Sequence, residues 1–205
     1  MRKIEPSFEL ISPIDRQAIL TNLELAGRNC YKSEGKITPE SAGKFIKMLI
    51  QHGTESVLEH EKITVRFICD RGVSHELVRH RIASYSQEST RYCNYGHDGQ
   101  LTFIVPEWYN HSTPETQKIW DDAMLIAEKS YLDLLKLGWT PQQARAVLPN
   151  SLKTDIIMTA NIREWRTIFR LRCATKAHPQ MRQLMIPFAN YLKEQLPELF
   201  EDINY

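Results

Sequence analysis

The stretch RHRIASYSQESTRY, residues 79–92, carries the side chains with the clearest capacity for chemistry in this sequence. Arg79, Arg81 and Arg91 fall within thirteen positions, together with three serines and one threonine. The planar guanidinium group of arginine donates paired hydrogen bonds to phosphate or carboxylate, and hydroxyl groups add further donors. The segment therefore predicts a binding site for an anionic ligand.

A fourth arginine, Arg172, lies where an apolar side chain is expected. Asn161 is a helix N-cap signal with Glu164 three residues on, and we project the helix that follows at about 100° per residue. Its apolar arc consists of Ile162, Trp165, Ile168 and Phe169. Arg172 falls in the middle of that arc, whereas the other arginines of the helix, Arg163, Arg166 and Arg170, cluster on a different one. Burying a guanidinium costs several kcal/mol unless acceptors or an anion meet it. The alternative is a helix that ends before residue 172, with the side chain turned to solvent.

Residues 74–82, SHELVRHRI, show the same conflict. If Leu77, Val78 and Ile82 face the interior, Arg81 projects between Leu77 and Val78. Internal ion pairs are the competing explanation, with nearby acceptors at Glu55, Glu59, Glu61 and Glu76. For a single arginine an ion pair is the better explanation. For the whole cluster a ligand is favoured, because Ser84, Ser86 and Ser89 add donors that a paired carboxylate does not need.

His80, between two arginines, is either a neutral hydrogen-bonding side chain or a general acid or base. His52 and His60 bracket a segment without the spacing of a metal site, so no metal is expected. The sequence also lacks both common glycine-rich phosphate loops. Side chains must therefore bind any phosphate.

The cysteines are far apart and form no C-x-x-C pair. They are Cys30, Cys69, Cys93 and Cys173. Neither a zinc site nor a disulfide framework is indicated, and we interpret them as reduced, partly buried thiols.

Length and composition fit one soluble globular domain over residues 1–205, with 42% hydrophobic and 25% charged residues. Lys and Arg number 26 against 25 Asp and Glu, and a net charge of +1 gives no general attraction to nucleic acid or a membrane surface. The N-terminus does not resemble a secretory signal, and no window approaches the roughly 20 apolar residues that span a bilayer. We therefore expect a cytoplasmic protein with neither nucleic-acid nor membrane partners.

The elements that must position these residues follow from apolar periodicity and helix-start signals. We expect helices over residues 15–30, from 38 to about 53, over 112–138, a short one from 140, and over 161–172 and 178–195. Strands are expected at 62–70, 101–105 and 153–160. The sum predicts an α+β fold, helix-rich, with a small, mainly antiparallel or mixed sheet of about four strands.

Three classes of function fit the residues alone. A nucleotide-using enzyme would bind phosphates through the arginines and hydroxyls. A nucleotide- or RNA-binding protein would use the 79–92 segment without catalysis and stack bases on Tyr92 and Tyr95, although no RRM or KH signature is present. A structural oligomer would bury the arginines in interface ion pairs.

Four sequence blocks, in the order in which they occur, resemble those of one known family. R-H-R, seven residues, Ser and then x-R-Y is similar to the signature of the flavin-dependent thymidylate synthases, with Arg79, His80, Arg81 and Ser89 at its fixed positions. The blocks HGTESVLEH, ARAVLPNSL and NIREWRTIFRLR also resemble that family's, in the same order. The resemblance covers most of the chain.

The resemblance implies reductive methylation of dUMP to dTMP, with 5,10-methylenetetrahydrofolate as carbon donor, FAD as hydride carrier and NADPH as reductant. It also implies a homotetramer whose sites are shared between subunits. The flavin would be bound by Ser56, Arg79, His80, Arg81, Gln87, Asn161, Arg163 and Thr167. The substrate would be bound by Glu76, Arg79, Gln87, Ser89, Arg91, Arg145 and Arg172, with Arg145 reaching across from a neighbouring subunit.

The resemblance assigns catalysis to Arg172, placed against the uracil ring, where a guanidinium favours ionisation at N3. No enzyme thiol is then required. Three positions depart from the family pattern: Thr54 where a His is expected, Ser86 where Asn is common, and Gln87 where some members have Glu. These departures concern the details of flavin binding and not the reaction.

Overall fold

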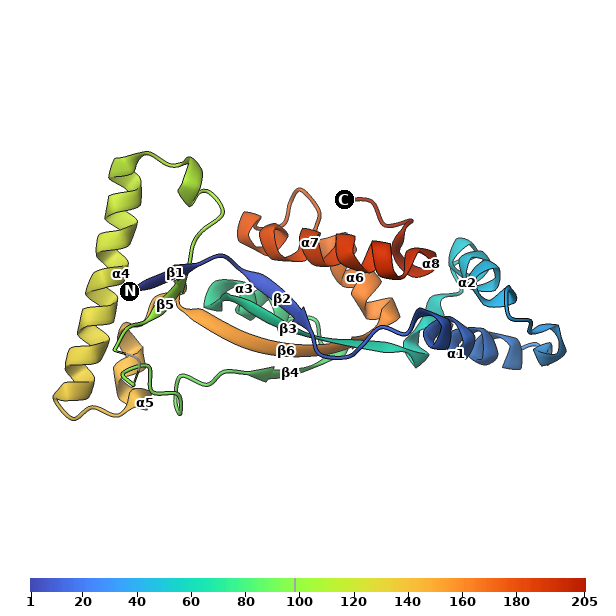
Figure 1. Cartoon of the computed structure of the whole chain (residues 1–205), viewed down its shortest axis with the longest axis horizontal. Coiled ribbons are helices and arrows are strands. Elements are labelled where there is room, and N and C mark those ends of the chain that lie inside the picture. The colour runs from blue at the N-terminus through green and yellow to red at the C-terminus, as the bar shows by residue number, and fades with distance from the viewer. Residues whose placement is uncertain (98) are drawn as a thin grey trace. The chain divides into compact units, whose positions relative to one another are not determined.

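Helices and strands alternate irregularly along the chain in the computed structural model, which describes residues 1–97 and 99–205 (Figure 1). The chain folds into two units. Unit 1 comprises Met1–Phe8, Phe67–Arg79 and Tyr85–Ile157, and unit 2 comprises Glu9–Arg66, His80–Ser84 and Met158–Tyr205. Each unit is assembled from three separate segments, so no single cut in the sequence divides them.

Unit 1 contains a parallel strand pair and the longest helix. β1 (Arg2–Ile4) pairs in parallel with β5 (Thr102–Ile104), and α4 (Pro114–Lys136) runs beside the pair (Figure 1). The Thr113 side chain accepts a hydrogen bond from the backbone N–H of Thr116, which caps the start of α4. Gly138, with φ +94, lies just beyond its end, in a conformation that glycine adopts without strain.

The core of unit 1 lies between α4 and the segments that precede and follow it. Its buried cluster consists of Leu101, Phe103, Met124, Tyr131, Ala144 and Leu152. The short elements of this unit are α3 (Arg71–Leu77), η3 (Tyr109–His111), α5 (Pro141–Ala144) and η4 (Arg145–Val147). α3 begins at Asp70, whose carboxylate accepts a hydrogen bond from the Val73 N–H at 2.8 Å.

A four-stranded antiparallel sheet has the order β2-β3-β6-β4. Its strands are β2 (Ser7–Leu10), β3 (Lys62–Asp70), β6 (Lys153–Asn161) and β4 (Ala83–Gln87). β3 buries Ile63, Val65 and Phe67, the face that alternation predicted, and β6 alternates in the same way.

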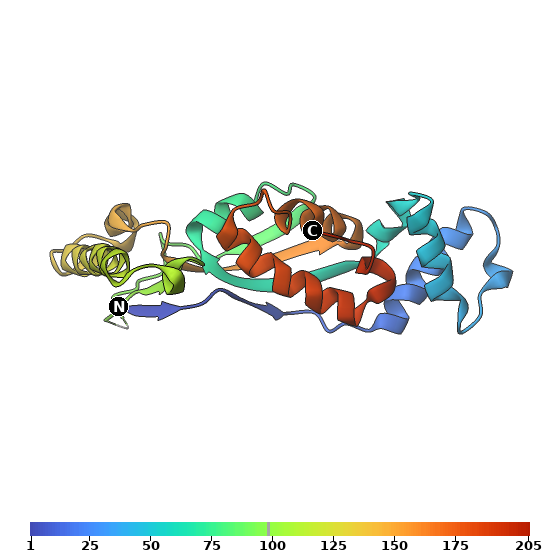
Figure 2. The ribbon, with the colours of Figure 1, turned by 90° about the horizontal axis from the view of Figure 1, so that it is seen from above.

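Unit 2 holds most of the remaining helices. They are α1 (Arg16–Asn29), η1 (Glu34–Lys36), α2 (Ser41–Gln51), η2 (Glu55–His60), α6 (Ile162–Arg172), α7 (Pro179–Gln195) and α8 (Pro197–Phe200). α1 packs on α2, α6 packs on α7 and η2, and α8 follows directly on α7 (Figure 2). Aromatic rings fill the interface of α6, α7 and α8, with Phe169 5.5 Å from Phe188 and 5.6 Å from Phe200 between ring centroids.

The predicted α+β class is confirmed, and each predicted helix and strand is present with ends shifted by at most a few residues. The interpretation of residues 74–82 is wrong. α3 ends at Leu77, so Val78 and Ile82 are 42% and 67% exposed rather than inward-facing. Arg81 is exposed and is not held between apolar side chains.

The prediction for α6 is right for Arg172 and incomplete for Arg166. The helix continues through Arg172, which is half-buried, so it does not end early to release this side chain. Arg166 was grouped with the arginines outside the apolar arc, but its side chain is completely buried. Both guanidinium Nη atoms donate to the Asp202 carboxylate at 2.7 Å, and Nε and Nη2 donate to Glu55 at 3.3 and 3.2 Å. The Leu199 carbonyl accepts a further hydrogen bond.

We expect Arg166→Ala to destabilise the protein by about 3–5 kcal/mol, because it removes a fully buried guanidinium and leaves the partly buried Glu55 carboxylate without this counter-charge. Arg170→Ala is the matched control. Arg170 also pairs with Glu55 but is 43% exposed, and such pairs contribute at most about 1 kcal/mol. Urea denaturation measures the free energy of unfolding of both variants. Equal losses in the two variants would contradict the assignment of Arg166 as the buried anchor.

Candidate active site

The predicted site residues divide between the two units. Unit 1 contains Glu76, Arg79, Gln87, Ser89, Arg91 and Arg145. Unit 2 contains Ser56, His80, Arg81, Asn161, Arg163, Thr167 and Arg172.

In unit 1, two arginines are held at the loop that follows β4. The backbone N–H groups of Tyr92 and Cys93 both bond to the Ser89 carbonyl, which closes a tight turn. Arg91 donates from Nε to Gln142 Oε1 at 3.0 Å. Arg145 donates from Nη1 to the hydroxyl of Thr90 at 3.2 Å. This loop therefore gathers two guanidinium groups and a serine hydroxyl from a single chain.

Neither of these guanidinium groups is neutralised within the protein. Arg91 and Arg145 are exposed, and among residues 1–97 and 99–205 neither forms an ion pair with a carboxylate. Their partners are an amide oxygen and a hydroxyl, which orient a guanidinium without cancelling its charge. The arrangement suits a dianionic phosphate. Arg145 was expected to reach across from a neighbouring subunit, and this stays a prediction; within its own chain it contacts Thr90.

Gln87 is held by buried polar side chains that the sequence interpretation missed. Its Nε2 donates to Ser74 Oγ at 2.8 Å and to Thr154 Oγ1 at 3.2 Å. Ser74 and Thr154 are both fully buried. Thr154 occupies an inward-facing position of the strand KTDIIMTA, and a polar residue there was the available signal. The two hydroxyls fix the orientation of the Gln87 amide.

In unit 2, Arg172 is hydrogen-bonded to His80. The Arg172 Nε donates to His80 Nε2 at 2.9 Å, across 92 positions of sequence. His80 is buried, with 7% exposure, and its other ring nitrogen, Nδ1, lies 3.3 Å from Glu164 Oε1. The three side chains form a chain of contacts from carboxylate through imidazole to guanidinium.

The imidazole in this chain is neutral. Burial, and secondly the nearby Arg172 guanidinium, lower the pKa of His80 from its ordinary value of 6.5 to about 4. With the pKa lowered in this way, the 3.3 Å contact with Glu164 is not an ion pair at neutral pH. The lowered pKa favours the interpretation of His80 as a neutral hydrogen-bonding side chain, which stays a prediction.

Other predicted flavin residues lie along η2 and the first turns of α6. Asn161 caps α6 by accepting from the Glu164 N–H at 2.8 Å, as predicted. Arg163 forms an ion pair with Glu59 of η2, and Thr167, one turn further along α6, donates to the Arg163 carbonyl. Ser56 is exposed on η2. On α6, the competing explanation of internal ion pairs therefore holds for Arg163, Arg166 and Arg170 but not for the contact between Arg172 and His80.

The two fully buried cysteines are poor nucleophiles. Burial raises the pKa of the Cys173 thiol to about 12 and also raises that of Cys69. A thiol rather than a thiolate is then present at neutral pH.

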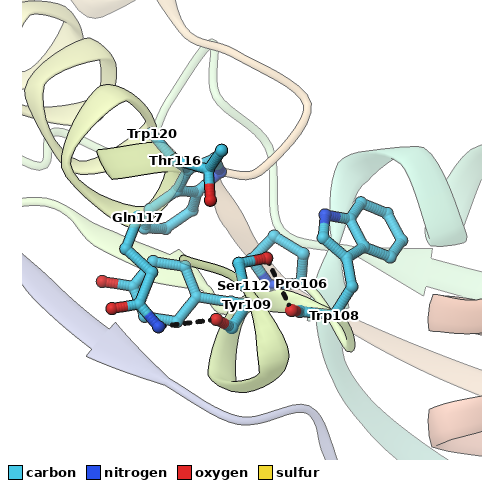
Figure 3. A pocket seen from close by; sticks show the side chains of 7 residues that line it. All are labelled: Pro106, Trp108, Tyr109, Ser112, Thr116, Gln117 and Trp120. Atoms are coloured by element: carbon cyan, nitrogen blue, oxygen red, sulfur yellow. Dashed lines mark hydrogen bonds between the residues drawn. The ribbon is translucent and has the colours of Figure 1, made fainter. Parts of the chain in front are cut away.

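Unit 1 also contains a cavity of about 280 Å³ that the sequence did not predict (Figure 3). Its lining consists of Pro106, Trp108, Tyr109, Ser112, Thr116, Gln117 and Trp120. The Tyr109 hydroxyl donates to Asp121 at 2.9 Å and accepts from Lys3 at 2.8 Å, which fixes one wall. No predicted site residue lines it, and none of its lining side chains carries a formal charge, so it does not suit a phosphate.

Residues 1–97 and 99–205 contain no group of three or more His, Cys, Asp or Glu side chains that could hold a metal ion. Within the same ranges, no helix has the length and apolar character needed to cross a bilayer.

The guanidinium groups at this hydroxyl-rich loop are oriented by neutral partners, and this suits a small anionic ligand. The almost zero net charge of the chain does not favour an RNA-binding module. Comparison with known proteins gives the family. The family model described as "Thymidylate synthase complementing protein" matches residues 14–198. The chain belongs to the family of flavin-dependent thymidylate synthases, and it is an enzyme.

Individual relatives support this assignment. The flavin-dependent thymidylate synthase of Geobacter sulfurreducens is 36% identical over 185 residues, covering 87% of this chain and 79% of the relative. That of Corynebacterium aurimucosum is 34% identical over 199 residues, covering 89% and 79%. That of Pyrococcus abyssi is 34% identical over 151 residues, covering 73% and 62%.

The depressed pKa of His80 predicts a pH dependence of stability. Between its ordinary pKa of 6.5 and about 4, the ring takes up a proton in the unfolded chain but not in the folded one. Acidification through this range should therefore lower the free energy of unfolding. In His80→Gln, the free energy of unfolding should depend less steeply on pH over the same range. His75→Gln, at an exposed histidine, is the control and should keep the pH dependence of the wild type. Identical slopes in wild type and His80→Gln would contradict a neutral, buried imidazole.

Proposed function

We propose that this chain catalyses the reductive methylation of dUMP to dTMP, with 5,10-methylenetetrahydrofolate as the carbon donor, FAD as the hydride carrier and NADPH as the reductant. The observation that supports this reaction is family membership over residues 14–198. The loop with Arg91 and Arg145 supports an anionic nucleotide as substrate. Binding without catalysis is not favoured, because the relatives are named as enzymes.

We assign the dUMP phosphate to Ser89, Arg91 and Arg145. The loop already orients both guanidinium groups through neutral partners, so little ordering is required when the phosphate binds. Glu76, Arg79 and Gln87 complete the substrate set in this proposal. The buried hydroxyls of Ser74 and Thr154 would hold the Gln87 amide in place.

Arg172 is the proposed catalytic residue. Its guanidinium, placed against the uracil ring, stabilises negative charge that develops when N3 is deprotonated. That charge makes the ring carbon C5 a better nucleophile toward the methylene carbon, and the effect is larger where water is excluded. Its Nε donates to His80 Nε2 at 2.9 Å, a contact that orients the guanidinium in this proposal.

The flavin set fits the donors that the structure offers. Ser56, Arg163 and Thr167 supply hydroxyl and guanidinium donors from η2 and α6, which pack together and suit a diphosphate and its ribityl chain. Arg79, His80, Arg81, Gln87 and Asn161 complete that proposed set. Once bound, FAD supplies the hydride chemistry and the protein supplies orientation and charge.

The proposal includes a homotetramer in which residues 1–205 act as one catalytic domain in the cytoplasm. Exposed apolar side chains on α4 support self-association. Ile119 and Ile126 are 70% and 67% exposed and lie seven residues apart, on one face of the helix.

The test of the reaction is direct. Purified protein with FAD should be yellow, should bleach when NADPH is added, and should form dTMP only when dUMP and methylenetetrahydrofolate are both present. A protein that binds dUMP and yields no dTMP under these conditions would favour the binding function without catalysis.

Arg172→Ala should lower kcat for dTMP formation by about 10²- to 10³-fold, because it removes the charge that stabilises the pyrimidine anion. Flavin absorbance at the end of purification should be unchanged. Arg172→Lys keeps the charge without the planar fork, so its kcat should fall between those of the wild type and Arg172→Ala. Near-normal turnover in Arg172→Ala would refute the role of this residue.

Because Arg91 and Arg145 lie on one loop cluster of one chain, they should serve the same site from the same subunit. We therefore expect Arg91→Ala and Arg145→Ala to weaken dUMP binding, and tetramers co-assembled from the two variants to regain no activity. Co-assembly of Arg91→Ala with wild type is the control for subunit mixing. Recovery of wild-type sites in the mixed tetramers would show that the two arginines come from different chains.

A further inference from the structure

Gln87 is bound on one side by two buried hydroxyl groups. Its Nε2 donates to Ser74 Oγ at 2.8 Å and to Thr154 Oγ1 at 3.2 Å, and both hydroxyl residues are fully buried. Ser74 lies on α3 and Thr154 on β6, so these contacts join Gln87, at the end of β4, to two other elements of unit 1. The fold of unit 1 therefore determines where this amide lies.

The hydroxyl proton of Ser74 decides which end of the Gln87 amide faces the interior. Ser74 Oγ also lies 2.9 Å from the Arg71 carbonyl, which can only accept, so the single proton of the hydroxyl is donated there. Ser74 Oγ can then only accept from Gln87, and the atom that approaches it must be the NH₂ nitrogen. The opposite orientation would place the amide oxygen 2.8 Å from Ser74 Oγ with no proton between them, and two such acceptors repel one another.

This orientation leaves Gln87 with one polarity toward a ligand. The amide NH₂ has two donors, and Ser74 and Thr154 accept both. Within residues 1–97 and 99–205, no group donates to the amide oxygen Oε1, and the side chain is partly exposed. The oxygen can therefore accept from a ligand, whereas the nitrogen has no donor left to offer.

We propose that Gln87 binds its ligand only as a hydrogen-bond acceptor, and that Ser74 is the positioning residue that sets this polarity. The inference rests on the proposed function, in which Gln87 belongs to both the dUMP and the FAD sets. The ligand group that it recognises is an N–H or O–H donor, which both molecules contain. Gln87 stands where some members of the family have Glu, and an ionised carboxylate likewise only accepts. The fixed amide therefore keeps the acceptor and omits the negative charge.

Removing the Ser74 hydroxyl should weaken binding of the ligand that donates to Gln87. Ser74→Ala leaves one amide N–H without its acceptor and lets the amide flip, because the Thr154 hydroxyl can donate as well as accept. We expect a rise in Kd of about 3- to 10-fold, the loss that corresponds to one neutral hydrogen bond. Calorimetric titration of dUMP into the flavin-loaded protein measures one affinity, and the rise in flavin fluorescence on dilution measures the affinity for FAD.

The two measurements identify which ligand supplies the donor. Weaker binding of dUMP alone assigns the donor to the nucleotide, weaker binding of FAD alone assigns it to the flavin, and weaker binding of both indicates a contact with each. Each of these results supports the proposal. Both affinities unchanged in a folded Ser74→Ala protein would overturn it.

Ser112→Ala is the matched control for the loss of a hydroxyl group. The Ser112 hydroxyl also donates to a backbone carbonyl, that of Trp108 at 2.8 Å, and it does not contact Gln87. Both Kd values should stay within about twofold of wild type in this variant.

A double-mutant comparison separates positioning from a general effect on the fold. If Ser74 acts through the Gln87 amide, Ser74→Ala should raise Kd by less than about twofold in a Gln87→Ala background. The same factor in both backgrounds would overturn the proposal. Thr154→Val keeps the shape of its side chain and removes the other acceptor, so it replaces Ser74→Ala if that variant does not fold. Its effect on Kd should also vanish in the Gln87→Ala background, and a loss that persists there would count against the proposal.

Both affinities are measured without turnover, so they do not depend on the reaction. A wild-type protein that binds dUMP and FAD but forms no dTMP would refute the proposed reaction, and the change in Kd caused by Ser74→Ala would still decide the polarity of Gln87. A wild-type protein that binds neither ligand would overturn both.

Discussion

A guanidinium group cannot leave water unless acceptors meet it, and the acceptor decides what the arginine can still do. Helix α6 shows both outcomes. Arg166 is completely buried and is matched by Asp202 and Glu55, so its charge is cancelled within the protein. Arg172, six residues later on the same helix, is met by the neutral ring of His80. The first arginine stabilises the fold, and the second is oriented through an uncharged ring nitrogen.

The same distinction holds in unit 1. Arg91 is oriented by the amide of Gln142, and Arg145 by the hydroxyl of Thr90, and neither group carries a charge. These are the arginines assigned to the substrate phosphate. Arg163, assigned to the flavin, is instead paired with Glu59 at an exposed position, where such a pair is weak and can be exchanged for a ligand anion at small cost.

Local patterns in the sequence account for most of the helices and for the long strands. The N-cap at Asn161 and the alternation in β3 and β6 depend on neighbours a few residues apart, and both were predicted correctly. β1 and β2, of three and four residues, are too short for periodicity to detect. The sequence did not indicate that α3 ends at Leu77. In the structure, the exposure of Val78 shows that the residue after the helix already faces solvent.

The site was predictable in its residue types and less so in its pairings. Helical projection singled out Arg172 because a charge on an apolar arc is a local anomaly. The same projection could not show that Arg166 is buried, because its partner Asp202 lies 36 positions away in the sequence, beyond α8. The partner of Arg172 lies 92 positions away, and the tautomer of His80 depends on that contact. Family resemblance supplied the roles, and only the fold supplied the hydrogen bonds behind them.

Arg172 and Cys173 are adjacent in sequence, and their surroundings give them opposite chemistry. Cys173 is the C-cap of α6 and is fully buried, and burial raises its pKa to about 12, so it remains a thiol. The same surroundings leave Arg172 charged, because its hydrogen-bond partner is an uncharged imidazole. In the proposed mechanism, this pair of neighbours suits stabilisation of charge on a pyrimidine by Arg172 rather than attack on the ring by Cys173.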